Sequence, residues 1–510
     1  MRGLYSFTAP SRHHKEVLMM RSKVPARLSS LLLLSLLISG TAHASAQACF
    51  EASHQDFTEV LACYKKAEAA KPLVYTATGT QAFPGVEKRS FDLVSGQWSP
   101  EGLVSPEGWQ HDVDIYIPDN ALRGRALLVA NNGTRIAGEG KEPSGPTDFT
   151  QAMALEVARQ TRTIVISVSN IPNQHLIYAD DGLPRTEDAS VAHSWKLFLD
   201  DPLRRPFMSV RLPMVVSLVK AMDLAQQELQ PWQINQFIAS GASKRGWTAW
   251  LAAIADERVH AIVPFAIDIL GMDKVLEHTR QAYGGNWPLA FFDYHHEGIT
   301  RQIKTEKFAR LLKIEDPLSY LNSAYAPRLS IPKYIVNASS DDFFLPDNSE
   351  FFFDPLPGPK ALRVTPNASH YGIKQFVENS LIPVINRWQQ DRALPVITTR
   401  SHLQGSRETL GLAFSEAPVR VTQWTAINPL ARDFRYPCGV RYESSDITPS
   451  APLNAQVLID TPDNGWKATF IEATFADGFV ATTPVQVTPN VYPNAAPPVI
   501  EPGCKTISDD

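Results

Sequence analysis

The segment Ile238–Gly246 restricts the fold of this chain more than any other part of the sequence. An apolar, strand-like run ends there in a turn of small residues that presents Ser243, and an apolar helical segment, Trp247–Ile254, follows. A strand, a sharp turn and a helix in this order form a nucleophile elbow, which exposes a serine hydroxyl above an α/β sheet. Gly241 and Gly246 suit such a turn because the strained backbone and the close approach of strand and helix leave no room for a Cβ. The segment therefore predicts an α/β fold with a candidate nucleophile at Ser243.

Alternating strand and helix patterns continue on both sides of this segment. Ala126–Ala130 and Thr163–Val168 are continuous apolar runs of the kind that a parallel sheet buries. The segment that contains Trp195 is expected to be irregular. The other expected strands are Leu73–Thr78, Lys88–Trp98, Gln110–Ile117, Val259–Asp268, Lys333–Asn337 and Ala361–Thr365, and the expected helices are Phe57–Ala70, Phe149–Thr161, Leu212–Leu229, Pro346–Phe353 and Ile373–Gln390.

Two regions depart from this alternation. Residues 270–326 are aromatic-rich and too long for a βα loop, so we expect them to form helices of their own, as a cap over the site. Beyond about Pro395 the helical periodicity ends, and short strand-like runs are separated by Pro, Gly, Asn and Asp. We predict an α/β domain over 49–394, with the cap at about 270–326, and a C-terminal β-sandwich-like domain over 395–510.

Residues 1–48 have the pattern of a Sec-type signal peptide with a possible upstream extension. Three basic residues, Arg21, Lys23 and Arg27, precede a short apolar run, Leu28–Ile38, and overlapping A-x-A sites follow it. The run is too short to span a bilayer, and no later segment qualifies as a membrane span. We therefore expect a periplasmic or secreted protein.

Four cysteines fit an oxidising compartment. Cys49 and Cys63 bracket a short helical segment, and Cys438 and Cys504 both lie in the C-terminal region. Four cysteines allow three pairings, and we expect two local disulfides. Zinc binding is the weaker interpretation because no C-x-x-C spacing exists. A formal net charge of -5 without a basic stripe gives no indication of a nucleic-acid partner.

Two further loops hold the residue types that a serine nucleophile needs. A serine requires a base to take its proton, and the base requires an acid to orient it. One predicted strand is followed by Asp341 and Asp342, and the next strand is followed by His370. The order serine, aspartate, histidine, each after a strand, is that of an α/β-hydrolase. We therefore predict a triad of Ser243, Asp341 and His370.

Each of these residues has a structural alternative. Ser243 alone could belong to an ordinary βα turn, the two aspartates could form an Asx turn that caps a helix, and His370 could be a surface loop residue. The conjunction of the three favours the triad. Asp341 is the preferred acid and Asp342 the second choice. Asp268, at the end of the preceding strand, is a third candidate because some hydrolases draw their acid from that position.

A tetrahedral intermediate also needs hydrogen-bond donors for its oxyanion. The backbone N–H of Lys244, the residue after the nucleophile, would supply one donor. Gly133 or Thr134, in the loop after the strand that ends at Ala130, would supply the other. We interpret the side chains of Lys244 and Arg245 as a solvated or structural basic pair rather than a substrate clamp.

Two other segments contain residue types that are common in functional sites. His295, His296 and Glu297 resemble a metal cluster, but adjacent histidines point apart on a helix and the H-E-x-x-H spacing is absent. The segment Tyr283–Trp287 could line a substrate pocket or form an aromatic packing turn, and the sequence leaves both interpretations open.

Several blocks of the chain together resemble the PhoPQ-activated pathogenicity-related protein family. They are Arg211–Met214, Ala221–Asp223, Ser240–Trp247, Ala282–Gly285, Phe343–Asp347 and Val364–Asn367. The resemblance implies a secreted bacterial protein with an α/β-hydrolase fold and the same site. Where the family typically has Gly-Asp-Glu, this chain has Ser340, Asp341 and Asp342, which supports Asp341 as the family aspartate. The resemblance implies little about the substrate.

The sequence as a whole predicts a secreted serine hydrolase that cleaves an ester or peptide/amide bond in a small-molecule or peptide substrate. No metal or organic cofactor is implied. The competing hypothesis is a non-catalytic secreted protein that uses the hydrolase scaffold for binding, because a fold alone does not guarantee chemistry. A peptidase specific for chain ends, with the cap as its gate, is a third possibility.

Overall fold

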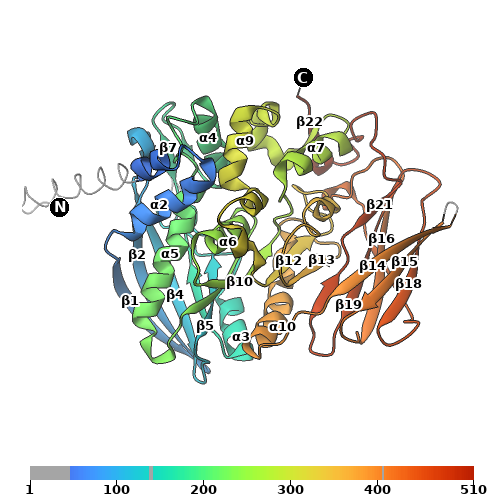
Figure 1. The fold of residues 1–510 in the computed structure, drawn as a ribbon, viewed down its shortest axis with the longest axis horizontal. Coiled ribbons are helices and arrows are strands. Elements are labelled where there is room, and N and C mark those ends of the chain that lie inside the picture. Colours follow the sequence, from blue (N-terminus) through green and yellow to red (C-terminus); the bar gives the residue numbers. More distant parts are fainter. Residues whose placement is uncertain (1–45, 137–141, 405–406, 510) are drawn as a thin grey trace, which may run out of the picture.

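A computed structural model describes residues 46–136, 142–404 and 407–509 of the chain. The predicted signal peptide falls almost entirely on residues 1–45, outside this described part. No helix within the described ranges is both long enough and apolar enough to cross a membrane. Figure 1 shows a central sheet flanked by helices, with a region of further strands at one end.

The central sheet has an antiparallel end followed by parallel strands. Its order is β1 (Val74–Phe83), β2 (Val86–Gln97), β4 (Gly108–Pro118), β6 (Ile164–Val168), β5 (Arg125–Ala130), β9 (Gln236–Ala242), β10 (Val259–Phe265), β12 (Lys333–Ala338) and β13 (Lys360–Thr365). The strands from β6 to β13 pair in parallel, and β4 pairs with β6 antiparallel. Because β6 lies between β4 and β5, the chain crosses over before it reaches β9. This topology is an α/β-hydrolase fold, as the sequence predicts.

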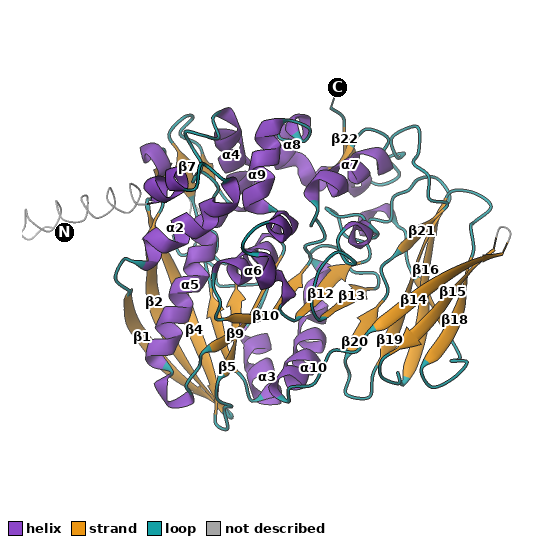
Figure 2. Ribbon diagram, viewed as in Figure 1, coloured by secondary structure: helices purple, strands orange, loops and turns teal. Residues whose placement is uncertain are grey.

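Helices cover both faces of the sheet (Figure 2). On one face lie α2 (Val60–Ala69), α5 (Arg211–Glu228) and α6 (Lys244–Ala255), and on the other lie α3 (Gln151–Thr161) and α10 (Val377–Gln389). The strand side chains alternate between the two cores: Ile164 and Ile166 pack on one face, and Val165 packs on the other. The parallel strands are therefore buried on both sides, which explains their continuous apolar sequence.

The carboxyl ends of the parallel strands face a further group of helices. They are α4 (Glu187–Asp200), α7 (Met272–Ala282), α8 (Phe292–His296) and α9 (Glu306–Glu315), and the last three lie in the predicted cap region. The segment that contains Trp195 is α4, so the expectation of an irregular segment is wrong. Thr186 followed by Glu187 and Asp188 is a helix-start signal, because acidic residues favour the first turn. The helix predicted over Pro346–Phe353 is only a short 3-10 turn, Asn348–Phe351.

The C-terminal region contains two facing sheets. One consists of β14 (Ile397–Gln404), β15 (Arg407–Phe414) and β18 (Asn454–Ile459), and the other of β16 (Arg420–Asn428), β17 (Glu443–Asp446), β19 (Trp466–Thr474), β20 (Val480–Thr482) and β21 (Gln486–Thr488). Leu412, Val457 and Ile471 belong to one shared core. The predicted β-sandwich-like character is therefore present. The second sheet also pairs with the central sheet, through Leu362 on β13 and Thr482 on β20.

Short pairings and two disulfides complete the chain. β3 (Val104–Ser105), β7 (Leu176–Tyr178) and β8 (Pro184–Arg185) form a small sheet, and β11 (Trp287–Pro288) pairs with β22 (Thr506–Ile507). The disulfides are Cys49–Cys63 and Cys438–Cys504, which confirms the two predicted local bridges.

Candidate active site

Ser243 stands in a strained turn between β9 and α6. Its backbone has φ 55° and ψ -128°, a conformation that L-residues rarely adopt. Two hydrogen bonds hold it: the Ser243 N–H donates to the Phe265 carbonyl (2.8 Å), and the Trp247 N–H donates to the Ser243 carbonyl (3.0 Å). A strained backbone that is fixed in this way is frequent at functional sites. The turn thus has the geometry that a nucleophile elbow requires.

The two glycines of the turn are required by close backbone contacts. A Cβ at Gly241 would lie 2.6 Å from the Arg245 carbonyl group. A Cβ at Gly246 would lie 2.9 Å from the Gly241 oxygen and 3.0 Å from the Phe265 oxygen. Both positions therefore exclude any larger residue unless the strand and the helix move apart.

Asp341 and His370 form a buried pair at the ends of β12 and β13. The His370 Nδ1 lies 2.9 and 3.0 Å from the two carboxylate oxygens of Asp341, and the side chains are almost completely buried. The Asp341 carboxylate also accepts from the backbone N–H groups of Phe343 (2.8 Å) and Phe344 (3.3 Å). Burial disfavours charge on His370, but Asp341 outweighs this effect and raises the pKa of the imidazole.

The other two candidate acids have different surroundings. Burial, together with the neighbouring Asp341, raises the pKa of Asp342 to about 6. Burial, together with Asp341 and Asp347, raises the pKa of Asp268 well above its usual range, and one Asp268 oxygen has no hydrogen-bond partner among the described residues. Within the described residues, neither carboxyl hydrogen-bonds to the His370 ring, which is the contact that an orienting anion makes with a histidine base. Asp341 is the aspartate whose side chain contacts the His370 ring.

Ser243 and His370 line the same cleft, which has a volume of about 270 Å³. Lys244, Asn132 and Tyr371 line it as well. Because Asp341 occupies Nδ1 of His370, Nε2 is the ring nitrogen left to act on a group in the cleft. The three residues predicted as a triad are thus brought to one edge of the sheet by three strand ends.

Within the described residues, the backbone N–H groups predicted as oxyanion donors differ in whether they are free and in whether their residues line the cleft. Lys244 begins helix α6 directly after Ser243, so its N–H is at a helix N-terminus. The Thr134 N–H donates to the Ser144 carbonyl (2.9 Å), which removes Thr134 from the candidate donors. Gly133 remains, with its backbone at φ 114° beside Ser144. Within the described residues, Asn132 lines the cleft, whereas Gly133 and Thr134 do not.

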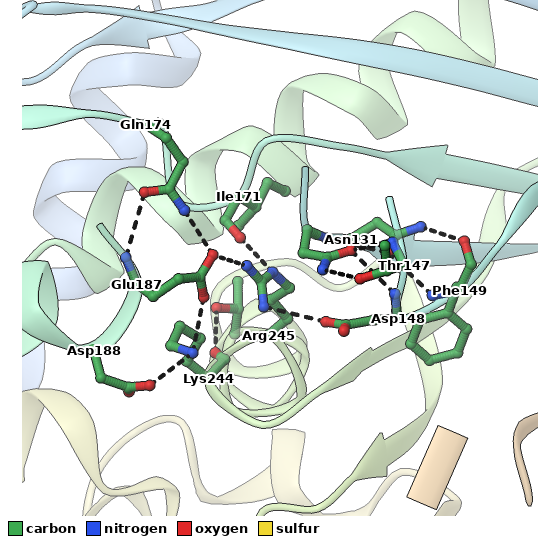
Figure 3. Close-up of polar contacts among 12 residues, drawn as sticks. Asn131, Thr147, Asp148, Phe149, Ile171, Gln174, Glu187, Asp188, Lys244 and Arg245 are labelled. Atoms are coloured by element: carbon green, nitrogen blue, oxygen red, sulfur yellow. Dashed lines mark hydrogen bonds and ion pairs between the residues drawn. The ribbon is translucent and has the colours of Figure 1, made fainter. Parts of the chain in front are cut away.

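The buried side chains of Lys244 and Arg245 form ion pairs with partly exposed acidic residues (Figure 3). The Lys244 Nζ lies 2.9 Å from Glu187 and 2.9 Å from Asp188, and the Arg245 guanidinium contacts Glu187 and, at 3.2 Å, Asp148. With 7% and 3% exposure the two basic residues are not solvated, so that part of the sequence interpretation is wrong. They are structural in the sense that they join α6 to the start of α4. The helix-start signal at Thr186 could have located these two acidic partners.

Clusters with metal-ligand chemistry lie away from the cleft. In the described part of the chain, three groups of ligand atoms each lie within 4.8 Å of one another: Asp180, Asp181 and His193; His278, Asp347 and Glu350; and Asp433, Cys438 and Cys504, whose two cysteines form a disulfide. In the second group, Asp347 already accepts from Arg432 and His278. The metal-like segment of His295, His296 and Glu297 does not converge on one point. His295 pairs with Asp509 (3.3 Å), whereas Glu297 pairs with His193 (2.9 Å).

Comparison with known proteins places the chain in a family. The model of the PhoPQ-activated pathogenicity-related protein family matches residues 61–435. The chain belongs to this family. A relative of this family member, autocrine proliferation repressor protein A of Dictyostelium discoideum, is 31% identical over 434 residues, which cover 79% of this chain and 85% of the relative.

Solved structures similar to this PhoPQ-related protein include two acetyl xylan esterases. The enzyme from Paenibacillus sp. R4 has a TM-score of 0.44 and 15% identity, over 65% of this chain and 93% of that chain. Acetyl xylan esterase 1 from Thermoanaerobacterium sp. JW/SL YS485 has a TM-score of 0.41 and 12% identity, over 64% of this chain and 93% of that chain.

Proposed function

We propose that this protein is a secreted or periplasmic serine hydrolase that cleaves an ester or amide bond through Ser243, His370 and Asp341. The observation that carries the proposal is the buried His370–Asp341 pair in the same cleft as a serine on a strained turn. Each group is weak alone, since a free serine hydroxyl is a poor nucleophile. Together they supply a nucleophile, a base and an orienting anion.

The reaction follows from these roles. The Ser243 Oγ attacks the substrate carbonyl while its proton passes to Nε2 of His370, and the Asp341 carboxylate stabilises the imidazolium. The tetrahedral intermediate then collapses, the bond to the alcohol or amine breaks, and His370 returns the proton to that leaving group. Water, deprotonated by His370, attacks the acyl-enzyme and releases the acid and free Ser243. The intermediate's oxyanion would accept a hydrogen bond from the Lys244 N–H, at the start of helix α6.

The location belongs to the same proposal. Two disulfides support an oxidising compartment, because such bonds persist outside the reducing cytosol. The sequence pattern of residues 1–48 points the same way.

A non-catalytic role is the second candidate, because the Dictyostelium relative is named a proliferation repressor. On this alternative the fold would serve as a binding scaffold, and the cleft residues would be retained for packing. The strained conformation of Ser243 argues for catalysis, since packing alone does not require it.

Hydrolysis of p-nitrophenyl acetate and of a peptide p-nitroanilide by the purified protein tests the proposal. We expect turnover of at least one substrate, and we expect Ser243→Ala to lower kcat by about 10⁴-fold or more. Ser240→Ala is the matched control, because Ser240 lies on the same strand and its hydroxyl donates to the Val263 carbonyl (2.6 Å). Equal activity of wild type and Ser243→Ala would overturn the triad.

A further inference from the structure

A second cavity meets the cleft at Ser243 and extends beneath the cap helices. Its volume is about 40 Å³, and its wall is mostly aromatic and aliphatic. We name it the apolar chamber. Its lining residues used below are Trp195, Trp247, Trp287, Tyr294, Leu276 and Ile303. Trp287 belongs to the segment Tyr283–Trp287, for which the sequence left a pocket and a packing turn open, and its ring lines this chamber.

The polar atoms of the aromatic wall already have partners. The Trp195 indole donates to Glu315 (2.9 Å), and the Trp247 indole donates to the Glu315 carbonyl (2.5 Å). The Trp287 indole donates to Asp509 (2.9 Å).

The remaining polar groups of the wall are paired in the same way. The Tyr294 hydroxyl donates to Asp188 (2.9 Å), and the Thr300 hydroxyl donates to Asp509 (3.2 Å). Asp188 and Lys244 pair with each other at 2.9 Å. A group bound in the chamber therefore contacts apolar surfaces. A polar group would lose its hydrogen bonds to water there without replacement.

The position of His370 decides which half of a substrate enters the chamber. His370 lines the polar cleft but is not among the residues of the chamber wall. The leaving group must receive its proton from His370, so it departs on the cleft side. The acyl group, which stays bound to Ser243, then points away from His370 and toward the chamber.

We propose that the apolar chamber is the acyl pocket and that it selects a short, unbranched or compact apolar acyl group. This inference rests on the proposed function and adds the substrate class. A volume of about 40 Å³ holds about three water-sized groups at ~10–15 Å³ each. A butyryl group, with three carbons beyond the carbonyl, fills it, whereas an octanoyl group exceeds it.

The alcohol side has the opposite character. The cleft is lined by charged residues, including Glu187, Lys244 and Arg245, and it continues into an open groove lined by Asp293, Asp342 and Arg435. These groups suit a polar, solvent-exposed leaving group. The substrate class is therefore an ester of a short fatty acid with a polar alcohol.

The acyl preference is tested with p-nitrophenyl acetate, butyrate and octanoate, measured as kcat/KM. Each buried methylene is worth about fourfold, so butyrate should exceed acetate by about 15-fold. Octanoate should fall at least tenfold below butyrate. A flat profile, or a preference for octanoate, would overturn the chamber proposal.

Two substitutions in the chamber wall test whether the chamber determines the acyl-chain preference. Leu276→Ala enlarges the chamber and should raise the octanoate-to-butyrate ratio at least fivefold, whereas Ile303→Phe fills it and should lower the butyrate-to-acetate ratio. Leu218→Ala is the matched control, because Leu218 is equally buried but lies on α5, outside the chamber wall. If Leu276→Ala does not fold, the half-buried Ile303 still gives the test. Ratios unchanged in the folded variants would contradict the proposal.

Labelling by a fluorophosphonate separates the two possible failures. If wild-type Ser243 is labelled but the ester profile is flat, the acyl pocket is wrong and the hydrolase proposal stands. If the folded protein is neither labelled nor active on any of the three esters, the proposed function fails and the acyl pocket fails with it.

Discussion

His370 experiences two opposing influences on its charge. Burial favours the neutral imidazole, and the Asp341 carboxylate at 2.9 Å favours the imidazolium. The carboxylate prevails, so the pKa of His370 lies above its ordinary value of 6.5. A base works only when unprotonated, and activity is therefore lost as the pH falls through this raised pKa. The acid limb of the pH–rate profile reports it directly.

Replacement of Asp341 should shift the acid limb of the pH–rate profile to lower pH. In Asp341→Asn the charge that raises the pKa is removed while burial remains, so the acid limb of kcat/KM should move to lower pH. The plateau should fall by about 10³–10⁴-fold, because the imidazolium loses its counter-charge and its orientation. The measurement is a pH profile of p-nitrophenyl butyrate hydrolysis for both proteins.

Asp342→Asn is the matched control for this experiment. Asp342 contacts the backbone N–H of His370 rather than its ring, and an amide oxygen can accept the same bond. We expect a plateau within about fivefold of wild type, because no charge-assisted bond to the imidazole is lost. A larger loss in Asp342→Asn than in Asp341→Asn would assign the acid to Asp342 instead.

At the scale of elements, the elbow depends on how closely β9 and α6 approach. The contacts of Gly246 with the Gly241 and Phe265 oxygens define that approach. Gly246→Ala should force the helix away from the strand, lower the free energy of unfolding by about 1–3 kcal/mol, and reduce kcat/KM more than tenfold.

Gly108→Ala provides the comparison for Gly246→Ala. A Cβ at Gly108, on strand β4, meets nothing within 4 Å, and its φ is not positive. This variant should keep wild-type activity and equal or slightly higher stability, because alanine restricts the unfolded chain. Denaturant unfolding and ester hydrolysis check both variants, and an unaffected Gly246→Ala would contradict the elbow geometry.

Some elements could be predicted from the sequence and others could not, for physical reasons. The parallel strands and the turn at Ser243 are predictable because burial on both faces and a glycine-dependent turn each leave a local pattern. Helix α4 is hard to predict although Thr186 precedes two acidic residues, because Trp195 and its neighbours are buried nearly all round and show no simple amphipathic stripe.

The hydrogen bond that removes Thr134 from the candidate oxyanion donors joins it to Ser144, which lies ten positions further along the chain. Its acceptor, Ser144, has no sequence pattern that links it to Thr134. The apolar chamber has the same origin, since its wall comes from α4, α6, the cap and two loops. The sequence shows which polar residues follow a strand. Tertiary packing decides which of these residues face a cavity.

At the scale of the whole molecule, the C-terminal region contributes to the walls of the candidate site. Strand β22 pairs with β11 in the cap, and Asp509 accepts from Trp287 and Thr300 in the chamber wall. Arg435 and Gly503 line the outer groove, and the disulfide Cys438–Cys504 lies beside them. The α/β-hydrolase fold supplies the positions of the proposed triad, and the added strands and C-terminal segment complete the walls around them.

The measurement that tests the central claim most directly is the site of covalent labelling by a fluorophosphonate, read by peptide mass spectrometry on the folded, disulfide-bonded protein. We predict one adduct, on Ser243, which is lost in Ser243→Ala and kept in Ser240→Ala. The rate of labelling should follow the unprotonated fraction of His370. A folded protein that takes no label, or takes it on another serine, would contradict the account.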